Sequence, residues 1–496
     1  MKEGTKRISR RDFVKLSTAG AGAAVLFAGL DAKDVLAKVP KKWDAEADFV
    51  IVGAGGAGLA AAAEAAARGA KVLLLEKTPV AGGSSLICGG GLAFAGTDMQ
   101  AAEGIKDSNE LLYKDMMKVG ENVNVPSVVQ AYVDNQLETY EYLKKLGVPF
   151  MKKIGAGGGS SVPRMHYVKP SDVIRILGDT AKAKGAKILL NTPVQKLVID
   201  EKTGRVRGVI GESKKKQVSY GARKAVILTS GGFSRNKPLL AKFVPPMANA
   251  ASLTGLGNYG DGLKMAWACG ADIQDMPYIK ATYGFDLDAK SIATDMSLIM
   301  YHGAIIVNKE GKRFVNESIS YKVIGDVALM QTGAMGFQVY DTAIREKAAS
   351  DPLARTQGLE ERGRVHIAPT LAELAQKMGV PVAVFEQTVN EYNAGVDSGK
   401  DTQFGRATLV SSIGKPLKIE KPPFYAFPST AVLIATYGGV LINNKAQVVD
   451  IFGSVIPGLY AAGEVTGGVH GAGYLSASAF PKALIFGRLA VKSALA

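Results

Sequence analysis

The chain has 496 residues, 47% of them hydrophobic and 21% charged, a balance typical of a globular enzyme rather than a disordered chain. This length predicts two or three domains. Sixty Lys and Arg against 45 Asp and Glu give a net charge of +15, which could attract an acidic partner or an anionic substrate. No basic run is interleaved with aromatic residues, so we expect no nucleic-acid partner. Two cysteines, Cys88 and Cys269, provide neither a disulfide framework nor a metal-binding spacing, and no metal is expected.

The N-terminus carries the pattern of an export signal. Arg10 and Arg11 lie in a twin-arginine motif, and a weakly apolar stretch, Thr18–Leu30, follows them. That stretch is too short for a membrane anchor, and Ala37 ends a plausible cleavage site. We therefore predict a twin-arginine signal peptide over residues 1–37 and export to the periplasm or the extracytoplasmic face. The alternative is a chance pair of arginines before an Ala-rich helix.

A dinucleotide-binding motif follows the signal. Phe49–Val52 reads as a buried parallel strand, and Gly53, Gly55 and Gly58 form G-x-G-x-x-G at the start of an Ala-rich helix. The first glycine permits the tight turn, the second lets a pyrophosphate approach the backbone, and the third lets helix and strand pack closely. Glu76 ends the next strand, where it can bind a ribose diol. Because strand, turn, helix and acid occur in this order, the sequence predicts a bound dinucleotide.

The rest of the chain predicts an α/β protein with an inserted domain. Residues 38–275 form the first part of a Rossmann-type domain, which resumes over residues 423–496 with strands at 431–442 and 459–462 and a helix at 477–495. Between them, residues 276–422 are poorer in glycine and richer in polar helices, which predicts an α+β cap domain over the substrate. No second dinucleotide unit is found. Electrons are therefore expected from a separate protein.

Six motifs together resemble the fumarate reductase/succinate dehydrogenase flavoprotein family, in its soluble single-chain branch, from about Asp48 to Ala496. They are the G-x-G-x-x-G with Glu76, Gly82–Ser85, Thr229–Phe233, Gly260–Gly262, Gly311–Glu317 and Gly458–Glu464. The resemblance implies FAD in a glutathione-reductase-like domain. It also implies non-covalent binding, because the flavin-transfer signature D-x-x-T-G-A-T is absent.

The motifs and the resemblance together give a set of expected FAD contacts. They are Gly53, Gly55, Ala57, Gly58, Glu76, Lys77, Gly82, Gly83, Ser84, Ser85, Gly89, Gly90, Gly91, Val194, Thr229, Ser230, Gly231, Asp261, Gly463, Glu464, Ser478 and Ala479. By the same resemblance, the stretch from Gly468 to Ala472 lies where the family places the isoalloxazine ring, so His470 is expected to contact the flavin or a substrate carbonyl.

The chain departs from fumarate reductases at the substrate. Tyr321 stands where they carry the proton-donating arginine, and Tyr474 stands where a second arginine grips a carboxylate. Two histidines are also missing, at Ala281–Tyr283 and Ile434–Gly439, and the glutamate of the proton relay aligns near Ser297. A dicarboxylate needs two cationic or forked donor sites. Fumarate is therefore an unfavourable substrate prediction.

A tyrosine at position 321 resembles the 3-ketosteroid Δ1-dehydrogenases, in which such a tyrosine handles the substrate proton. A phenol is protonated at neutral pH and can donate to a carbon as it becomes enolate-like. We expect Tyr321 to donate this proton, and Tyr474 with the N–H groups near Gly473 to polarise the carbonyl. Tyr321 could instead be a packed aromatic side chain with its hydroxyl bonded to backbone, and Tyr474 a wall aromatic that stacks on the substrate.

These observations predict an exported FAD-dependent oxidoreductase that reduces an activated C=C bond in an enoate, aryl acrylate or enone. The electrons would come from a separate cytochrome or a membrane quinol dehydrogenase. Two alternatives stay open: a 3-ketosteroid-type dehydrogenase running in the opposite direction, and a flavoprotein electron-transfer subunit without its own substrate. Arg164 and His166 could bind an anionic substrate, and Lys322 could lower the pKa of Tyr321.

Overall fold

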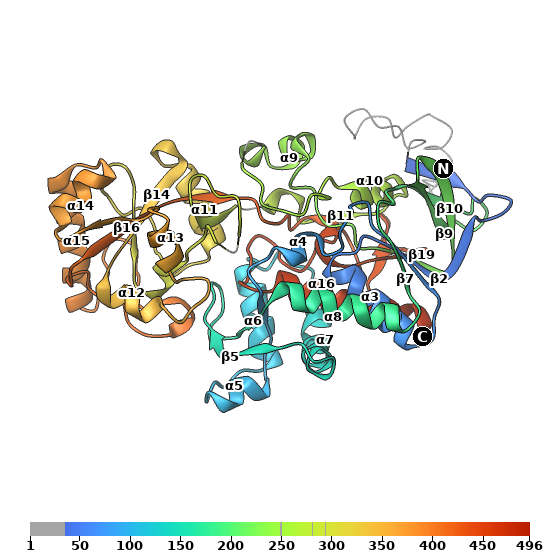
Figure 1. Ribbon diagram of the computed structural model, residues 1–496, viewed down its shortest axis with the longest axis horizontal. Helices are drawn as coiled ribbons and strands as arrows, with labels where there is room; N and C mark the ends of the chain where they lie inside the picture. The colour runs from blue at the N-terminus through green and yellow to red at the C-terminus, as the bar shows by residue number, and fades with distance from the viewer. Residues whose placement is uncertain (1–34, 249, 280, 293) are drawn as a thin grey trace, which may run out of the picture.

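Two sheets organise the chain, in a computed structural model that describes residues 35–248, 250–279, 281–292 and 294–496. Figure 1 shows them as two lobes joined side by side, with the yellow and orange segments forming the smaller one. The twin-arginine motif lies outside the described residues. Among those that are described, no helix is long and apolar enough to cross a membrane.

The larger sheet has nine strands and a parallel centre. Its order is β1-β8-β9-β10-β2-β3-β7, with β19 paired to β10 and β18 to β19. Val50 of β2 lies opposite Leu73 of β3 and Val226 of β10. The bounds are β1 Leu36–Lys38, β2 Ala45–Val52, β3 Val72–Leu75, β7 Lys187–Leu189, β8 Val194–Ile199, β9 Val206–Ser213, β10 Lys216–Leu228, β18 Gln447–Val449 and β19 Val455–Ala461. The predicted Rossmann-type α/β fold is confirmed.

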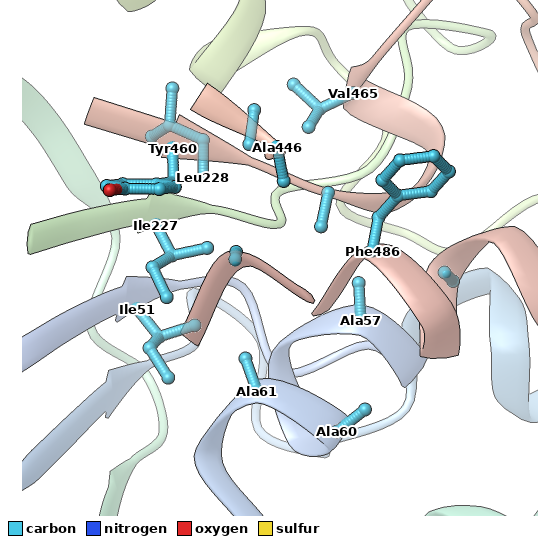
Figure 2. Close-up of a cluster of buried hydrophobic side chains, with 14 of the residues drawn as sticks. Ile51, Ala57, Ala60, Ala61, Ile227, Leu228, Ala446, Tyr460, Val465 and Phe486 are labelled. Atoms are coloured by element: carbon cyan, nitrogen blue, oxygen red, sulfur yellow. The ribbon is translucent and has the colours of Figure 1, made fainter. Parts of the chain in front are cut away.

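Small residues let the helices approach this sheet closely. The helices α3 (Gly56–Ala67), α8 (Pro170–Ala183) and α16 (Ala479–Leu495) pack together against it. Figure 2 shows Ala61 of α3 on the side of Ile51 of β2, and Ala57 of α3 next to Phe486 of α16. A Cβ atom at Gly487 would come within 2.3 Å of the Ala57 carbonyl oxygen, so this crossing depends on glycine. The tight packing holds the first turn of α3 in place.

A helical layer and a small sheet complete the larger lobe. The sheet has the order β4-β6-β5, with β4 at Gly91–Ala93, β5 at Phe150–Gly155 and β6 at Met165–Val168. The helices are α4 Gly83–Leu86, α5 Asp98–Ala102, α6 Asn109–Val119, α7 Pro126–Lys145, α9 Lys237–Phe243 and α10 Asp261–Ala268. A short antiparallel pair, β11 (Ile273–Gln274) and β17 (Gly439–Val440), stands where the chain passes between the lobes.

The smaller lobe is the α+β insertion, but it extends further than predicted. Its sheet runs β12-β16-β14-β13 with β15 beside β16. The strands are β12 Thr282–Phe285, β13 Ile305–Val307, β14 Met335–Asp341, β15 His366–Ala368 and β16 Phe424–Val432; the helices are α11 Tyr321–Leu329, α12 Thr342–Ala348, α13 Gln357–Glu361, α14 Leu371–Met378 and α15 Val382–Asp397. Because Phe424–Thr430 of β16 pair with β14 in the smaller sheet, the predicted return to the larger lobe at residue 423 is wrong. An apolar run alone does not indicate which sheet it joins.

Candidate functional site

The site is a cavity of about 530 Å³ between the two lobes. The larger lobe contributes the turn between β2 and α3, the glycines after α4 and the start of α16. The smaller lobe contributes Tyr301 and the first two residues of α11, and Tyr437 follows β16 on the connection between the lobes. One cavity therefore joins the predicted cofactor motifs to the predicted catalytic tyrosines.

The three glycines of the first turn meet different surroundings. Gly53 has a φ of +107°, and a Cβ atom there would lie 2.5 Å from the Thr229 carbonyl oxygen. At Gly58 a Cβ atom would lie 1.9 Å from the Gly53 oxygen. At Gly55 the nearest atom would be 3.8 Å away, so the space in front of it is open. This open backbone at the N-terminus of α3 fits a pyrophosphate.

Glu76 is held where a ribose would bind. It follows β3, is buried, and accepts hydrogen bonds from the N–H of Ala54 at 2.8 Å and the N–H of Thr78 at 2.8 Å. Beside it, Lys77 pairs with Asp261 at 2.6 Å. A carboxylate fixed by backbone donors at the end of the second strand fits recognition of a ribose diol.

A second acid, Glu464, also lines the cavity. Glu464 accepts from the N–H of Thr436 at 2.8 Å and from Nδ2 of Asn258 at 3.0 Å, and burial raises its pKa. Asn258 also donates to the hydroxyl of Ser84 at 3.2 Å. The Ser230 hydroxyl is buried and finds no hydrogen-bond partner within the described part of the chain. Ser230 is one of the lining residues, and a bound dinucleotide could satisfy a buried polar atom of this kind.

Most of the predicted contacts line the cavity, and four do not. The predicted residues that line it are Gly53, Gly55, Ala57, Glu76, Lys77, Gly83, Ser84, Ser85, Gly89, Gly90, Gly91, Val194, Thr229, Ser230, Gly231, Asp261, Tyr321, Gly463, Glu464, His470, Tyr474 and Ala479. Gly58 and Gly82 lie behind it. Gly473 packs on the Val119 carbonyl, where a Cβ atom would lie 2.1 Å away, and the Ser478 hydroxyl donates to the Leu475 oxygen at 2.6 Å.

The sequence matches the FAD-binding domain family over residues 48–479. This chain belongs to that family. It is 36% identical over 454 residues to the fumarate reductase (cytochrome) of Shewanella frigidimarina, covering 90% of this chain and 76% of that protein. It is 32% identical to the urocanate reductase of Eggerthella lenta, covering 92% and 76%. The protein is an FAD-dependent oxidoreductase that acts on CH–CH bonds.

A solved structure extends the likeness to a ketosteroid enzyme. The 3-ketosteroid-Δ4-(5α)-dehydrogenase of Rhodococcus jostii, in complex with 4-androstene-3,17-dione, matches with a TM-score of 0.75 and 28% identity. The match covers 93% of this chain and 99% of that one. The family and the fold predicted from the motifs are thereby confirmed.

Buried ion pairs fix the loop that carries Tyr321 to the cavity. Glu317, fully buried, pairs with Arg313 at 2.8 Å and with Arg406 at 3.4 Å. These contacts anchor the segment just before α11. Ser320 then caps the helix, its hydroxyl accepting from the N–H of Lys322 at 3.3 Å. The G-K-R-F-V-N-E motif thus positions the helix whose first residue is Tyr321.

Four tyrosines form the wall of the cavity. The N–H of Tyr321 donates to the Tyr301 hydroxyl at 2.7 Å, the rings of Tyr321 and Tyr474 lie with centroids 6.1 Å apart, and the Tyr474 hydroxyl oxygen accepts from the N–H of Ala479 at 3.3 Å. The Tyr437 and Tyr474 rings stack with centroids 5.5 Å apart. Burial raises the pKa of Tyr321 well above its usual value and that of Tyr474 to about 12. Both phenols are therefore protonated at neutral pH and can donate.

His470 is enclosed by the same rings. Its centroid lies 5.3 Å from those of Tyr437 and Tyr474. Burial first, and then the charges of Lys482 and Lys322, lower its pKa well below the usual value. The imidazole is neutral at physiological pH, so it suits hydrogen bonding to a ligand better than donation as a cation.

Two buried lysines, Lys322 and Lys482, complete the lining. The sequence suggested Lys322 only as a group that could lower the pKa of Tyr321, and it did not single out Lys482. Lys322 is 1% exposed, with Nζ 5.2 Å from the Tyr437 ring centroid and 5.5 Å from that of Tyr474. Burial lowers its pKa to about 7. Lys482 of α16 donates to the Thr466 oxygen at 2.6 Å, and burial lowers its pKa to about 8. Tyr321 and Lys322 both line the cavity although they are adjacent, because the site lies at the tip of α11.

Arg164 and His166 do not face the cavity, so the expectation that they bind an anionic substrate is wrong. Arg164 is fully buried and pairs with Asp107 and Asp115, each at 2.9 Å. His166 lies in β6 with a ring nitrogen 2.8 Å from the Thr97 hydroxyl, and burial lowers its pKa to about 4. Both residues stabilise the larger lobe. Asp107 and Asp115, before and within α6, were the features of the sequence that could have indicated acidic partners for Arg164 inside the fold.

Proposed function

We propose that this protein reduces an activated C=C bond conjugated to a carbonyl, in an enone or a monocarboxylic enoate, with FAD held non-covalently. The observation that carries the proposal is the pair of buried phenols, Tyr321 and Tyr474, whose ring centroids lie 6.1 Å apart in the cavity that the FAD-binding motifs line. One arginine, Arg235, lies among the described lining residues, and it donates to backbone oxygens of Thr254 and Gly255. This lining lacks the two forked cations that a dicarboxylate favours.

The tyrosines supply the proton chemistry. When bound, FAD supplies the electron pair that reaches one carbon of the double bond. Tyr474 donates a hydrogen bond to the substrate carbonyl and stabilises the negative charge that develops there. Tyr321 transfers its hydroxyl proton to the neighbouring carbon. The rings of Tyr301 and Tyr437 exclude water from both groups.

The relatives support this range of substrates. One is named as a urocanate reductase, and the ketosteroid enzyme has 4-androstene-3,17-dione, an enone, in its complex. The ketosteroid likeness also favours a second candidate, the reverse reaction, in which Tyr321 would accept a proton from a saturated ketone. The tyrosines serve either direction, so the electron partner decides it.

We further propose that the protein acts outside the cytoplasm and receives electrons from a separate cytochrome or membrane quinol dehydrogenase. The twin-arginine motif supports export, because that route carries folded proteins with a cofactor already bound. The net charge of +15 supports an acidic partner surface.

Reoxidation of the reduced enzyme tests the function. The purified holoprotein is reduced with viologen and mixed with fumarate, cinnamate or 4-androstene-3,17-dione, and the flavin absorbance is followed. Rapid reoxidation by cinnamate or the enone, with fumarate at least about tenfold slower, is the expected result. Preference for fumarate would contradict the proposal, and oxidation of saturated ketones by the oxidised enzyme alone would favour the reverse reaction.

A further inference from the structure

Each turnover of the proposed reaction removes a proton from a group that solvent scarcely reaches. Tyr321 and Tyr474 are each 8% exposed, and Tyr437 beside them is 1% exposed. A phenolate left there is unfavourable, because burial raises the pKa of both Tyr321 and Tyr474. The proton must therefore be replaced before the next turnover. The cavity needs a donor that connects the phenols to the outside.

Two hydroxyl groups of the smaller lobe, those of Tyr301 and Ser297, are poor candidates for this donor. The Tyr301 hydroxyl donates to the Ile319 oxygen at 2.9 Å, and the Ser297 hydroxyl donates to the Ala354 oxygen at 2.6 Å. Their protons are already engaged with backbone carbonyls. His470 is neutral at physiological pH, and Lys482 donates to the Thr466 oxygen.

Lys322 is placed for the task. It follows Tyr321 directly on α11, and its Nζ lies near the faces of both the Tyr437 and Tyr474 rings. One bridging water would complete a path from this nitrogen to a phenol oxygen. One helical turn further, Asp326 is half-buried and interacts electrostatically with Lys322. The two side chains thus connect the cavity with the outer part of the helix.

We propose that Lys322 and Asp326 form the route by which protons from solvent reach the Tyr321–Tyr474 pair. This inference rests on the proposed function. Tyr321 gives its proton to the substrate carbon and becomes a phenolate. The O–H proton of Tyr474 passes to the oxygen of the neighbouring Tyr321, and the Lys322 ammonium restores a proton to Tyr474, becoming a neutral amine. Asp326 then passes a proton from solvent to the amine, so the charges and protons of the cycle balance.

The charges around Lys322 give the route a pH dependence. Asp326 on the same helix and Glu464 after β19 raise its pKa, against the larger lowering by burial. The other facing groups are Tyr437, Tyr474 and His470, which are neutral. Since the ammonium is the donor and its pKa is about 7, steady-state turnover should fall as pH rises through 7. Removing the Asp326 charge should move this fall to lower pH.

Comparison of the first turnover with the steady state tests the route. Reduced holoenzyme is mixed with cinnamate or 4-androstene-3,17-dione, and the rate of a single turnover is measured. The steady-state rate is then measured with reduced viologen present to reduce the flavin again after each turnover. Lys322→Met should keep the first-turnover rate within about twofold, because Tyr321 already carries its proton, while the steady-state rate falls about 100-fold. Lys322→Arg should also be slow in the steady state, because arginine keeps its proton. Asp326→Asn should move the fall in steady-state turnover to lower pH.

Surface variants Lys418→Met and Asp397→Asn, which remove an exposed ion pair of the smaller lobe, serve as controls. Equal losses in first turnover and steady state would overturn the route. The route would also be overturned if Lys322→Arg kept full activity while Lys322→Met raised KM. That result would show that Lys322 binds a substrate anion. If the wild-type enzyme reduces neither acceptor, the proposed function fails, and the route fails with it.

Discussion

At the scale of single residues, substitutions at Gly55 and Gly58 should distinguish an effect on folding from an effect on cofactor binding. Gly58→Ala places a Cβ atom 1.9 Å from the Gly53 oxygen, so it should destabilise the apoprotein by about 1–3 kcal/mol. Gly55→Ala meets protein atoms only at 3.8 Å, so the apoprotein should melt near the wild-type temperature while its FAD affinity falls. Thermal melts with and without FAD measure both effects. Equal losses of apoprotein stability in the two variants would contradict this reading.

The buried charge of Lys322 should cost stability in a pH-dependent way. Its pKa is about 7 in the folded protein against the usual 10.5, so the folded state holds the ammonium at a penalty that is full below pH 7. This free-energy penalty becomes smaller as pH rises from 7 toward 10.5. Lys322→Met should therefore raise Tm by about 2 °C or more at pH 6, and by less at pH 9. Melting curves at the two pH values measure this, and a pH-independent difference would contradict it.

At the scale of elements, Arg164 holds the start of α6 and strand β6 together. Arg164→Met leaves Asp107 and Asp115 as unpaired buried carboxylates, which should cost about 3–5 kcal/mol. Arg175→Met on the exposed face of α8, where the side chain is 62% exposed, is the matched control and should change stability little. Chemical denaturation measures the difference. A stable Arg164 variant with a raised substrate KM would restore the substrate-binding interpretation.

The elements near the cofactor could be predicted from sequence because local chemistry dictates them. Gly53, Gly58 and Glu76 each satisfy a backbone requirement that any dinucleotide turn imposes. The predicted domain boundary at residue 423 assigns the residues of β16 to the larger lobe, whereas the strand pairs with β14 of the smaller one, because long-range pairing decides where an apolar strand goes. The position of Lys322 depends on the angle at which α11 meets the cavity, and that angle is set by the pairing of Glu317 with Arg313 and Arg406. No periodicity in the sequence indicates this angle.

At the scale of the whole molecule, the two lobes meet beside the cavity through Ser411. Its hydroxyl accepts from the N–H of Gly157 at 3.0 Å and donates to the Gly157 oxygen at 2.7 Å. Ser411→Ala should weaken this contact by about 1 kcal/mol and speed amide exchange in the loop at residues 155–161. Ser412 has a similar positive φ but an exposed side chain, so Ser412→Ala should leave amide exchange in the loop unchanged. Hydrogen-exchange mass spectrometry checks this, and unchanged exchange in both variants would contradict it.

The proposed reaction depends on the hydroxyl proton of Tyr321 in a cavity built by both lobes. The most direct measurement is the rate at which viologen-reduced Tyr321→Phe enzyme is reoxidised by cinnamate or 4-androstene-3,17-dione. Tyr392→Phe is the matched control, because it removes another buried phenol hydroxyl remote from the cavity. We predict a loss of about 100-fold or more for Tyr321→Phe, with FAD content retained, and an unchanged rate for Tyr392→Phe. Full activity of Tyr321→Phe would contradict the central claim.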